Sequence, residues 1–473
     1  MKLTRLVVGL FGVTYIAGTL AHPYIDGDLF WQRWLGEIIL RTHEIPRTLG
    51  LETFAAVGAP WTPQEWLFSL LFAIASRMHA AWFFEMAVGV CVAMTLALVA
   101  LRASRRASPV ATTIALIVCG VALDPSLGVR AQDVGWLFFA AFLVLLDSTD
   151  TNVYWAIPLV ALWSNVHASA MLALPIIIID LFVAVMSQDG SMFRRGAVLL
   201  GVCAALCANP FGLGLPLYAF HLSGSPIRTY IVEWQAFAWT QPSWYAVFVP
   251  TMLIFGLRFR AVLAQPRELL RVILLAIMSC IALRNIALFA ILAAPLLATT
   301  LDPWCRIWSE RLASLILPDA RMVGVMSALL LAIVFAGSYW ASYVPLGGRL
   351  PFAALSILQR VSGEKRLFCS DFAWCSLALG RPDTRVYLDG RADPFPWAAW
   401  RRYLRIDRGG EAALRELEQI HATAVLATPE SPLDRQLLHS SVWRRIYGDS
   451  LSELFVVRRS IIHVSPAATR NPT

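Results

Sequence analysis

Apolar segments close to the length of a membrane span recur from the N-terminus of the chain to about Tyr343. A bilayer core of ~30 Å needs about 20 apolar residues in each helix that crosses it. Of the 473 residues, 58% are hydrophobic and 15% are charged, whereas soluble globular chains carry about 25% charged residues. We therefore predict an α-helical polytopic membrane protein.

Basic residues between the apolar segments predict which side of the membrane each loop faces. Lys2 and Arg5 place the N-terminus in the cytoplasm, because lysine and arginine are retained in inner loops. About eleven spans follow, several shorter than the usual length of about 20 residues. Every cluster of two or more arginines between spans then faces the cytoplasm. The predicted spans are 1–21, 80–101, 110–123, 134–146, 154–164, 168–186, 197–208, 244–257, 272–283, 286–300 and 322–343.

The net charge of +8 is spread over the short loops. It therefore carries topology information, and we expect no nucleic-acid partner. Residues 1–21 have a basic start, an apolar run and a small-residue end, which also fits a cleavable signal peptide. An uncleaved first helix is favoured, because a whole membrane domain follows and the polar loop after it needs an anchor.

The loop 22–67 holds the acidic residues that we expect to carry chemistry. Asp26 and Asp28 form a D-x-D pair, and Glu65 precedes Trp66. Such a pair can bind a divalent cation, or one carboxylate can act as a general base while the other tunes it. Between them, apolar residues recur at helical spacing and predict an amphipathic helix in the membrane interface. These residues are Leu29, Trp31, Trp34, Leu35, Ile38 and Ile39. The alternative is a solvated loop with a surface helix.

Polar residues of several later loops fall on the same outer side. They are Asp124, Arg130, Asp133, Asn165, His167, Glu233, Arg284 and Asn285. Polar groups near membrane depth are costly and tend to line cavities, so we predict one outward-facing polar cavity. Arg130 and Arg284 could grip a phosphate or pyrophosphate in a bidentate way, or extend toward lipid headgroups. His167 and Glu233 could instead have structural roles, whereas Asn165 is expected to line the cavity.

After Tyr343 the sequence changes to that of a small soluble α/β domain. We predict a membrane domain at 1–344, with the acidic first outer loop 22–67, and an extracytoplasmic α/β domain at 345–473. Strands are expected at 366–369, 385–388, 424–427, 445–448 and 454–457, and helices at 371–379, 397–406, 411–421 and 433–439. Asp389, Arg391 and Asp393 follow a strand end, where such sheets often place ligands. A salt bridge that braces the turn is an equal alternative.

The eight cysteines do not form a recognisable metal site, since no C-x-x-C pair occurs. Most lie in apolar segments as small core residues. Cys369 and Cys375 could form a disulfide if the C-terminal domain faces an oxidising compartment.

Several sequence blocks resemble a known family. They are Asp-Gly-Asp-Leu-Phe-Trp-Gln-Arg-Trp-Leu-Gly-Glu (26–37), Trp-Thr-Pro-Gln-Glu-Trp-Leu (61–67), Leu-Trp-Ser-Asn-Val-His-Ala (162–168), Asn-Pro-Phe-Gly (209–212), Arg-Asn-Ile-Ala-Leu-Phe (284–289) and Val-Tyr-Leu-Asp-Gly-Arg-Ala-Asp (386–393). With the order of spans and the final soluble domain, the chain resembles the GT-C superfamily of integral membrane glycosyltransferases. It is closest to a bacterial multi-pass group.

The resemblance implies a role for particular residues. Asp26 and Asp28 inherit the position of the catalytic base or metal ligand, with a divalent cation as a possible cofactor. Asp133 matches the second outer acidic site, although this chain has Arg130-Ala131-Gln132 where many relatives carry Arg-Pro-Gln. Arg284 or Arg130 would bind the lipid phosphate.

The resemblance also implies an activity and a location. The expected reaction is transfer of a sugar from a polyprenyl-phosphate donor to an envelope glycan, lipid or protein, at the outer face of the bacterial inner membrane. One alternative is a non-catalytic GT-C-like factor that binds lipid-linked glycans for polymerisation, ligation or export. Another is a transporter, which the clustering of charges at span ends on one side, without an internal repeat, disfavours.

Overall fold

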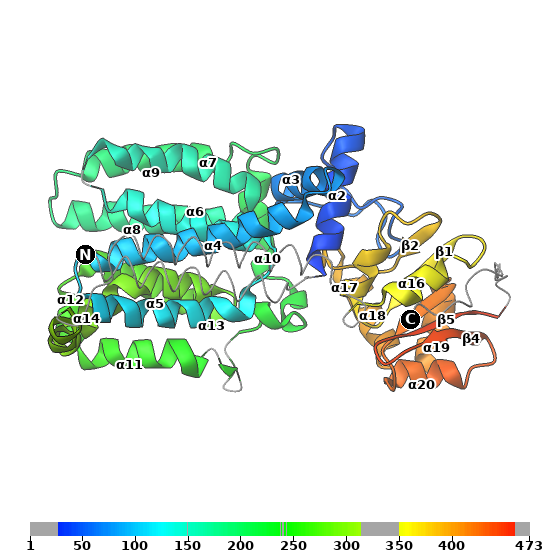
Figure 1. Ribbon diagram of the computed structural model, residues 1–473. Helices are drawn as coiled ribbons and strands as arrows, with labels where there is room; N and C mark the ends of the chain where they lie inside the picture. Colours follow the sequence, from blue (N-terminus) through cyan, green and yellow to red (C-terminus); the bar gives the residue numbers. More distant parts are fainter. Residues whose placement is uncertain are drawn as a thin grey trace. The chain divides into compact units, whose positions relative to one another are not determined.

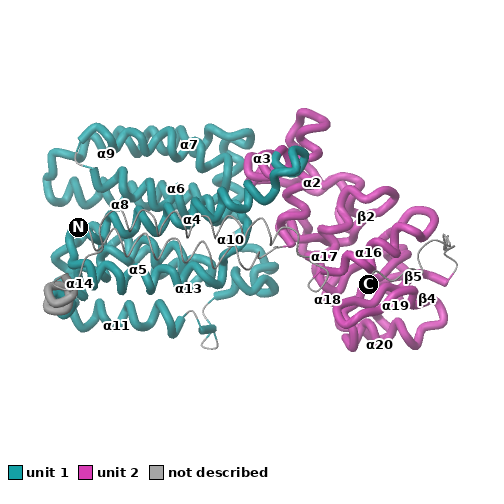
Figure 2. The backbone as a smooth tube through the Cα atoms, in the orientation of Figure 1, with its two compact units in different colours: residues 1–26, 75–343 teal, residues 27–74, 344–473 magenta. Residues whose placement is uncertain are grey.

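The computed structural model describes residues 27–313, apart from 149, 237, 239–240 and 243, and residues 350–458. The chain divides into two compact units (Figure 2). Unit 1 comprises Met1–Asp26 and Ala75–Tyr343, and unit 2 comprises Gly27–Ile74 and Val344–Thr473. Most of the first outer loop therefore belongs to the same compact unit as the C-terminal part of the chain.

Unit 1 is a bundle of helices, most of which lie side by side along one common direction (Figure 1). Its α-helices are α4 Ala81–Ser104, α5 Pro109–Leu123, α6 Ala131–Leu146, α7 Ala156–Val166, α8 Ala173–Met186, α9 Met192–Ala205, α10 Gly214–Ser223, α11 Val249–Leu257, α12 Phe259–Leu263, α13 Pro266–Ile281 and α14 Asn285–Ala313. Short 3-10 turns lie at Asp124–Ser126, Thr151–Trp155, Ala168–Leu172, Pro226–Thr229 and Val232–Trp234, and a π-helical turn lies at Trp244–Phe248.

Four helical segments among the described residues are long and apolar enough to cross a membrane. They are Ala81–Ser104, Pro109–Ser126, Ala168–Met186 and Asn285–Arg306. Shorter apolar helices lie at Trp66–Arg77, Ala131–Leu146 and Trp244–Leu257. The protein is thus a multi-pass membrane protein, but the expected number of about eleven spans is not confirmed. The predicted spans 1–21 and 322–343 lie outside the described residues.

Helix α14 is the most deeply buried of the long helices. Phe289, Ile291 and Leu292 on it are fully buried, and it packs against α5, α4 and α13. The sequence predicted that a span would end at Thr300. The structure corrects this, because α14 continues without a break to Ala313 and accommodates Pro295 and Pro303 inside the helix.

Unit 2 contains the small sheet domain that the sequence predicted. Its strands are β1 Lys365–Cys369, β2 Thr384–Val386, β3 Ala424–Ala427, β4 Trp443–Gly448 and β5 Glu453–Val457, in the order β2-β1-β3-β5-β4. Strand β1 pairs in parallel with β2 and β3, and β5 pairs antiparallel with β3 and β4. The helices are α16 Phe352–Leu358, α17 Phe372–Cys375, α18 Trp397–Asp407, α19 Glu411–Gln419 and α20 Pro432–Leu438. Cys369 and Cys375 form a disulfide.

The first outer loop contains the helix α2 Asp28–Thr42 and leads into a second helix, α3 Trp66–Arg77, which begins at the end of the loop. The predicted helix is present, but its apolar face is covered by protein rather than left for lipid: Leu29 and Leu35 are buried. Gly36 explains the close packing, because a Cβ there would stand 2.1 Å from the Ser69 carbonyl oxygen and 2.6 Å from the Ala73 Cβ. The two helices therefore touch backbone to backbone.

Candidate functional site

Polar side chains gather at one end of the helix bundle of unit 1. We call it the outer cluster, after the side of the membrane predicted from the sequence. It consists of Arg130, Gln132, Asp133, His167, Glu233 and Arg284. The chain brings them together because α6 begins, α7 ends and α13 ends at this side. Arg130 directly precedes α6, Asp133 lies in its first turn, and Arg284 lies between α13 and α14. Five of the six were predicted from the sequence.

Glu233 links the two arginines of the outer cluster. Its carboxylate lies 3.0 Å from Arg130 Nη1 and 4.0 Å from Arg284 Nη1. Arg284 Nη2 donates a 2.8 Å hydrogen bond to Gln132 Oε1, and the Arg284 backbone N–H donates to the Glu233 carbonyl. Both arginine side chains are about one quarter exposed, at 26% and 25%. The two arginines are therefore partly exposed, and Glu233 and Gln132 hold their side chains in place.

The ionisation of Glu233 follows from these neighbours. Burial alone would raise the pKa of Glu233, but the charges of Arg284 and Arg130 outweigh it, and its pKa lies below its ordinary value. Glu233 is accordingly an anion at neutral pH. Two guanidinium cations and one carboxylate leave the three groups with a net positive charge.

His167 is held as a neutral imidazole beside this cluster. Its Nδ1 accepts a hydrogen bond from the Ser169 backbone N–H and lies 2.8 Å from Ser169 Oγ. Burial, with the nearby charge of Arg284, lowers the pKa of His167 to about 3. Asn165 has a different role, because its Nδ2 donates to the carbonyl oxygens of Ala161 and Ala208 and so ties α7 to the end of α9.

Asp133 is the most enclosed acid of the outer cluster. Its side chain is fully buried, and Oδ2 accepts a 3.1 Å hydrogen bond from the Gly128 backbone N–H. The other oxygen, Oδ1, has no hydrogen-bond partner among the described residues. Buried polar atoms are nearly always paired, so this carboxylate is unusual within the bundle.

A second charged cluster lies at the opposite end of α6. The sequence predicted its arginines on the cytoplasmic side, but its acids were missed. We call it the inner network, after the side of the membrane predicted for its arginines. It consists of Arg102, Asp147, Asp180, Arg195, Glu268 and Arg271. Its ion pairs include Arg102–Asp147 at 2.8 Å, Arg195–Asp180 at 2.6 Å and Arg271–Asp180 at 2.5 Å. Arg271 also pairs with Asp147 and Glu268. Charges therefore lie at both ends of the spans, not on one side as predicted.

The two clusters are separated by the length of α6. Asp147 caps the C-terminus of this 16-residue helix and Arg130 precedes its N-terminus, which corresponds to about 24 Å at 1.5 Å per residue. Arg102, Arg195 and Arg271, which the positive-inside rule placed in the cytoplasm, share one end. The predicted outer residues of unit 1 share the other.

Two of the predicted acids of the first outer loop, Asp28 and Glu65, lie in unit 2. Asp28 begins α2, and its Oδ1 accepts a 2.9 Å hydrogen bond from Trp31 Nε1. Glu65 accepts hydrogen bonds from Gln32 Nε2 and, at 2.8 Å, from Gln64 Nε2. The second member of the predicted pair, Asp26, lies outside the described residues. Among residues 27–313 and 350–458, no group of three or more His, Cys, Asp or Glu could hold a metal ion, and a cation at Asp26 and Asp28 stays a prediction.

The turn after β2 contains an internal ion pair. Of the two alternatives predicted for this turn, a ligand site or a salt bridge that braces it, the salt bridge is present. Arg391 Nη2 lies 2.6 Å from Asp389 Oδ2, and both side chains are fully buried. The further partner was not foreseen: Arg391 Nη1 lies 2.9 Å from Glu52 Oε1 in the first outer loop. No local sequence pattern signals a pairing across so much chain.

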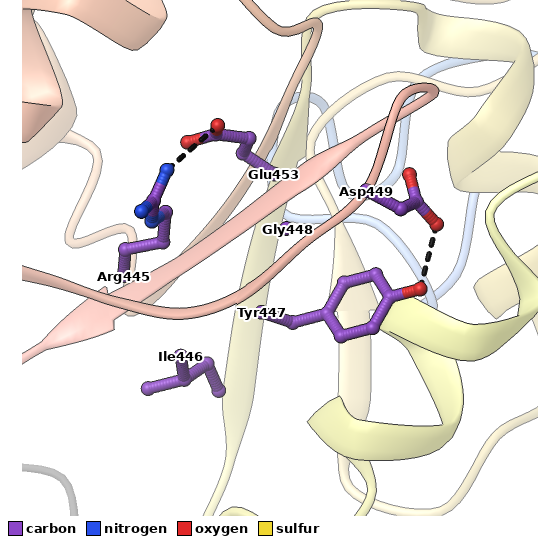
Figure 3. Close-up of a pocket in the computed structure, with 6 residues that line it drawn as sticks. All are labelled: Arg445, Ile446, Tyr447, Gly448, Asp449 and Glu453. Atoms are coloured by element: carbon purple, nitrogen blue, oxygen red, sulfur yellow. Dashed lines mark hydrogen bonds and ion pairs between the residues drawn. The ribbon is translucent and has the colours of Figure 1, made fainter.

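One open hollow of about 440 Å³ lies on the β4–β5 hairpin (Figure 3). Its polar groups pair with each other, since Arg445 bonds Glu453 at 2.8 Å and the Tyr447 hydroxyl donates to Asp449 at 2.6 Å. The hydrogen bond to Asp449 raises the pKa of Tyr447 to about 12. The hollow is open and its charged groups pair mainly with each other, although Glu453 Oε2 has no hydrogen-bond partner among the described residues, and we do not propose it as a functional site.

Known structures share the fold of this chain. The oligosaccharyltransferase AglB of Archaeoglobus fulgidus, solved with an inhibitory peptide and a dolichol-phosphate, matches 96% of this chain and 75% of its own with a TM-score of 0.57 and 11% identity. ArnT of Cupriavidus metallidurans matches 95% of this chain and 97% of its own, with a TM-score of 0.53 and 14% identity for the apo state and 13% for the complex with undecaprenyl phosphate. No family model and no curated protein sequence matches the chain.

Proposed function

From the premise that this chain has the GT-C fold of polyprenyl-phosphate-dependent membrane glycosyltransferases, we propose that it transfers a sugar from a polyprenyl-phosphate donor to an acceptor of the cell envelope. The transfer takes place on the outer side of the bacterial inner membrane. The observation that carries the proposal is the arginine pair Arg130 and Arg284, fixed by Glu233 at one end of the bundle.

The arginine pair suits a lipid phosphate. A guanidinium offers five N–H donors in a planar fork that matches phosphate oxygens. Glu233 and Gln132 hold Arg284 from one side, so its orientation is set before a ligand arrives. A similar structure, ArnT, was solved with undecaprenyl phosphate.

The reaction would be a single displacement at the anomeric carbon of the sugar. The acceptor hydroxyl oxygen forms the new bond while the bond between the sugar and the lipid phosphate breaks. Asp28 takes the hydroxyl proton, and Arg130 and Arg284 stabilise the negative charge on the departing polyprenyl phosphate. Holding donor and acceptor together supplies much of the rate enhancement.

The disulfide supports an extracytoplasmic C-terminal domain. Cys369 and Cys375 are bonded, and disulfides persist in oxidising compartments such as the bacterial periplasm. This agrees with the location expected from the count of spans.

Two measurements on the purified full-length chain in nanodiscs test the proposal. The first is binding of undecaprenyl phosphate alone. Arg284→Gln and Arg130→Gln should each weaken it about tenfold, since each removes a charge-assisted contact. Arg105→Gln, which changes an exposed arginine just after α4, is the control. Equal binding by all four proteins would remove the phosphate site.

The second measurement is sugar transfer from labelled undecaprenyl-phosphate-linked hexoses and pentoses to envelope lipid and glycan fractions. Asp28→Asn should abolish transfer and leave lipid binding intact. Full transfer by this variant would remove the role of Asp28. A wild-type protein that binds the lipid yet turns over none of the donors would instead be a non-catalytic factor.

A further inference from the structure

The C-terminal sheet receives the first outer loop at the edge where such sheets bind ligands. Strand β1 pairs in parallel with β2 on one side and with β3 on the other. The connections that follow β1 and β2 therefore lead to opposite sides of β1, which makes the carboxyl end of β1 a topological switch point. Ligands of α/β sheets bind outside the carboxyl ends of the strands at such a point. In this protein, the turns that follow β1 and β2 contact residues 27–61 of the same unit instead.

Backbone hydrogen bonds extend the sheet with the loop. Thr53 forms a parallel bridge with Val386, the last residue of β2. The Val386 N–H donates to the Glu52 carbonyl at 2.9 Å, and the Phe54 N–H donates to the Val386 carbonyl at 3.0 Å. Thr53 Oγ1 donates to the Tyr387 carbonyl. Residues 52–54 thus add to the open edge of β2 as a strand adds to a sheet.

Arg391 holds the loop from the other side. It pairs with Asp389 of its own turn and Glu52 of the loop. Its guanidinium carbon lies 5.0 Å from the Trp34 ring centroid and 4.7 Å from that of Trp61. A buried arginine between two carboxylates and two indole rings is satisfied only while the loop is docked.

The middle residue of the same turn lies against Asp28. A Cβ on Gly390 would stand 3.2 Å from Asp28 Oδ1, 3.2 Å from Trp31 Cδ1 and 2.8 Å from Ser376 Oγ. Ser376 Oγ accepts the Gly390 N–H at 2.8 Å. A side chain at position 390 would therefore press on the Asp28 carboxylate, and the absence of one lets the carboxylate lie against the turn.

The segment closed by the disulfide also contacts the first outer loop. Cys369 and Cys375 close a short ring that contains Ala373. The Ala373 Cβ lies 3.0 Å from the Cβ that Gly27 would carry, directly before Asp28. The ring and the turn after β2 thus contact the two residues at the start of α2.

We propose that the turn Asp389-Gly390-Arg391 of the C-terminal domain is a positioning element for Asp28: Arg391 anchors the first outer loop through Glu52, and Gly390 with Ser376 sets the place of the Asp28 carboxylate. The catalytic part of this inference rests on the proposed function, whereas the docking part does not. These residues act through Asp28 and do not touch the substrate.

Amide hydrogen exchange on the full-length chain tests the docking part. Glu52→Gln removes a charge from the anchor and leaves the Arg391–Asp389 pair in place. Exchange at Phe54 and Val386 should accelerate about tenfold, as expected for the loss of one charge-assisted hydrogen bond, while β3 stays protected. Arg402→Lys, which alters a surface pair with Glu416, is the control. Unchanged exchange at Phe54 and Val386 in Glu52→Gln would overturn the anchor.

Sugar transfer tests the positioning part. Gly390→Ala should lower kcat at least about tenfold, the factor expected from about 1.4 kcal/mol of lost transition-state stabilisation, and leave KM for the lipid-linked donor unchanged. Gly448→Ala, where a Cβ would make only an ordinary contact at 3.6 Å with Glu453, is the matched control. An unchanged kcat in a folded Gly390→Ala protein, or an equal rise in KM, would overturn the positioning role. An inactive wild type would reject the proposed function, while the exchange result would still decide the docking.

Discussion

Arg391 and Glu52 are 339 positions apart in the chain, and their side chains meet at 2.9 Å. The contact joins the turn after β2 to the loop between α2 and α3, and both lie in unit 2. The acidic first loop and the C-terminal domain, which look like separate parts of the sequence, therefore form one folded body.

Replacing Arg391 with methionine should destabilise unit 2 by about 3–5 kcal/mol, because it leaves the Asp389 carboxylate buried without a cation. Arg415→Met is the control, since its pair with Glu411 is exposed and such pairs contribute about 0–1 kcal/mol. Thermal unfolding in detergent, monitored by amide hydrogen exchange in β3, measures the difference in stability between the two variants. Equal melting of the two variants would contradict the buried pair.

The inner network should be a stability element of the bundle. Asp180 bridges Arg195 and Arg271, and all three side chains are buried. Asp180→Asn should cost about 3–5 kcal/mol, because two buried guanidinium groups lose their shared anion. The loss of lipid binding on heating measures this destabilisation. The control is Asp124→Asn, which changes an exposed acid directly after α5. If both variants inactivate together, the network contributes nothing to stability.

His167 should not titrate in the physiological range. Its pKa is lowered to about 3 by burial and by Arg284, so the imidazole stays neutral as the pH falls from 8 to about 5 and becomes charged only near pH 3. Binding of undecaprenyl phosphate should therefore have the same pH dependence in wild type and His167→Gln. An inflection near the ordinary histidine pKa of about 6.5 that disappears in His167→Gln would refute this.

The disulfide should stabilise unit 2 and the seat of the first loop. Cross-linking a short loop contributes about 2 kcal/mol, because it restricts the unfolded chain. Replacing both Cys369 and Cys375 with serine should lower the melting temperature of unit 2 and accelerate exchange at Leu29 and Phe30. A reductant should have the same effect on the wild type and none on the double variant. A wild-type melting temperature that a reductant does not change would refute the bond.

The sequence predicted local structure well where a local pattern existed. The short apolar run Ala424–Ala427 was predicted as a strand and is β3, and the period of Trp397–Ile406 predicted α18 within one residue. The sequence also placed Arg130 and Arg284 on the same side of the membrane, and the structure brings them together at Glu233; that this end faces outward stays a prediction. The inner acids Asp147 and Asp180 were missed, since the sequence shows that a charge lies in a span or at its end but not which neighbouring helix packs against it.

The contact between the first outer loop and the C-terminal sheet is not signalled by any local sequence pattern. Thr53 and Val386 pair through backbone groups, which every residue carries, and nothing near either one in sequence names the other. The Asp-Gly-Arg turn was recognised at a strand end, but its partner could not be chosen from sequence alone. Only the folded chain shows that the edge of the sheet is filled from within.

The edge of β2 also constrains the order in which the protein can mature. A ribosome releases Glu52 and Thr53 long before it reaches Val386 and Arg391, so the early loop is complete while its strand partner is still unmade. Closing so long a stretch of chain is slow, since non-local pairing limits folding rates. Asp28 therefore gains its final surroundings among the last events of biogenesis, and a chain truncated before β2 lacks them altogether.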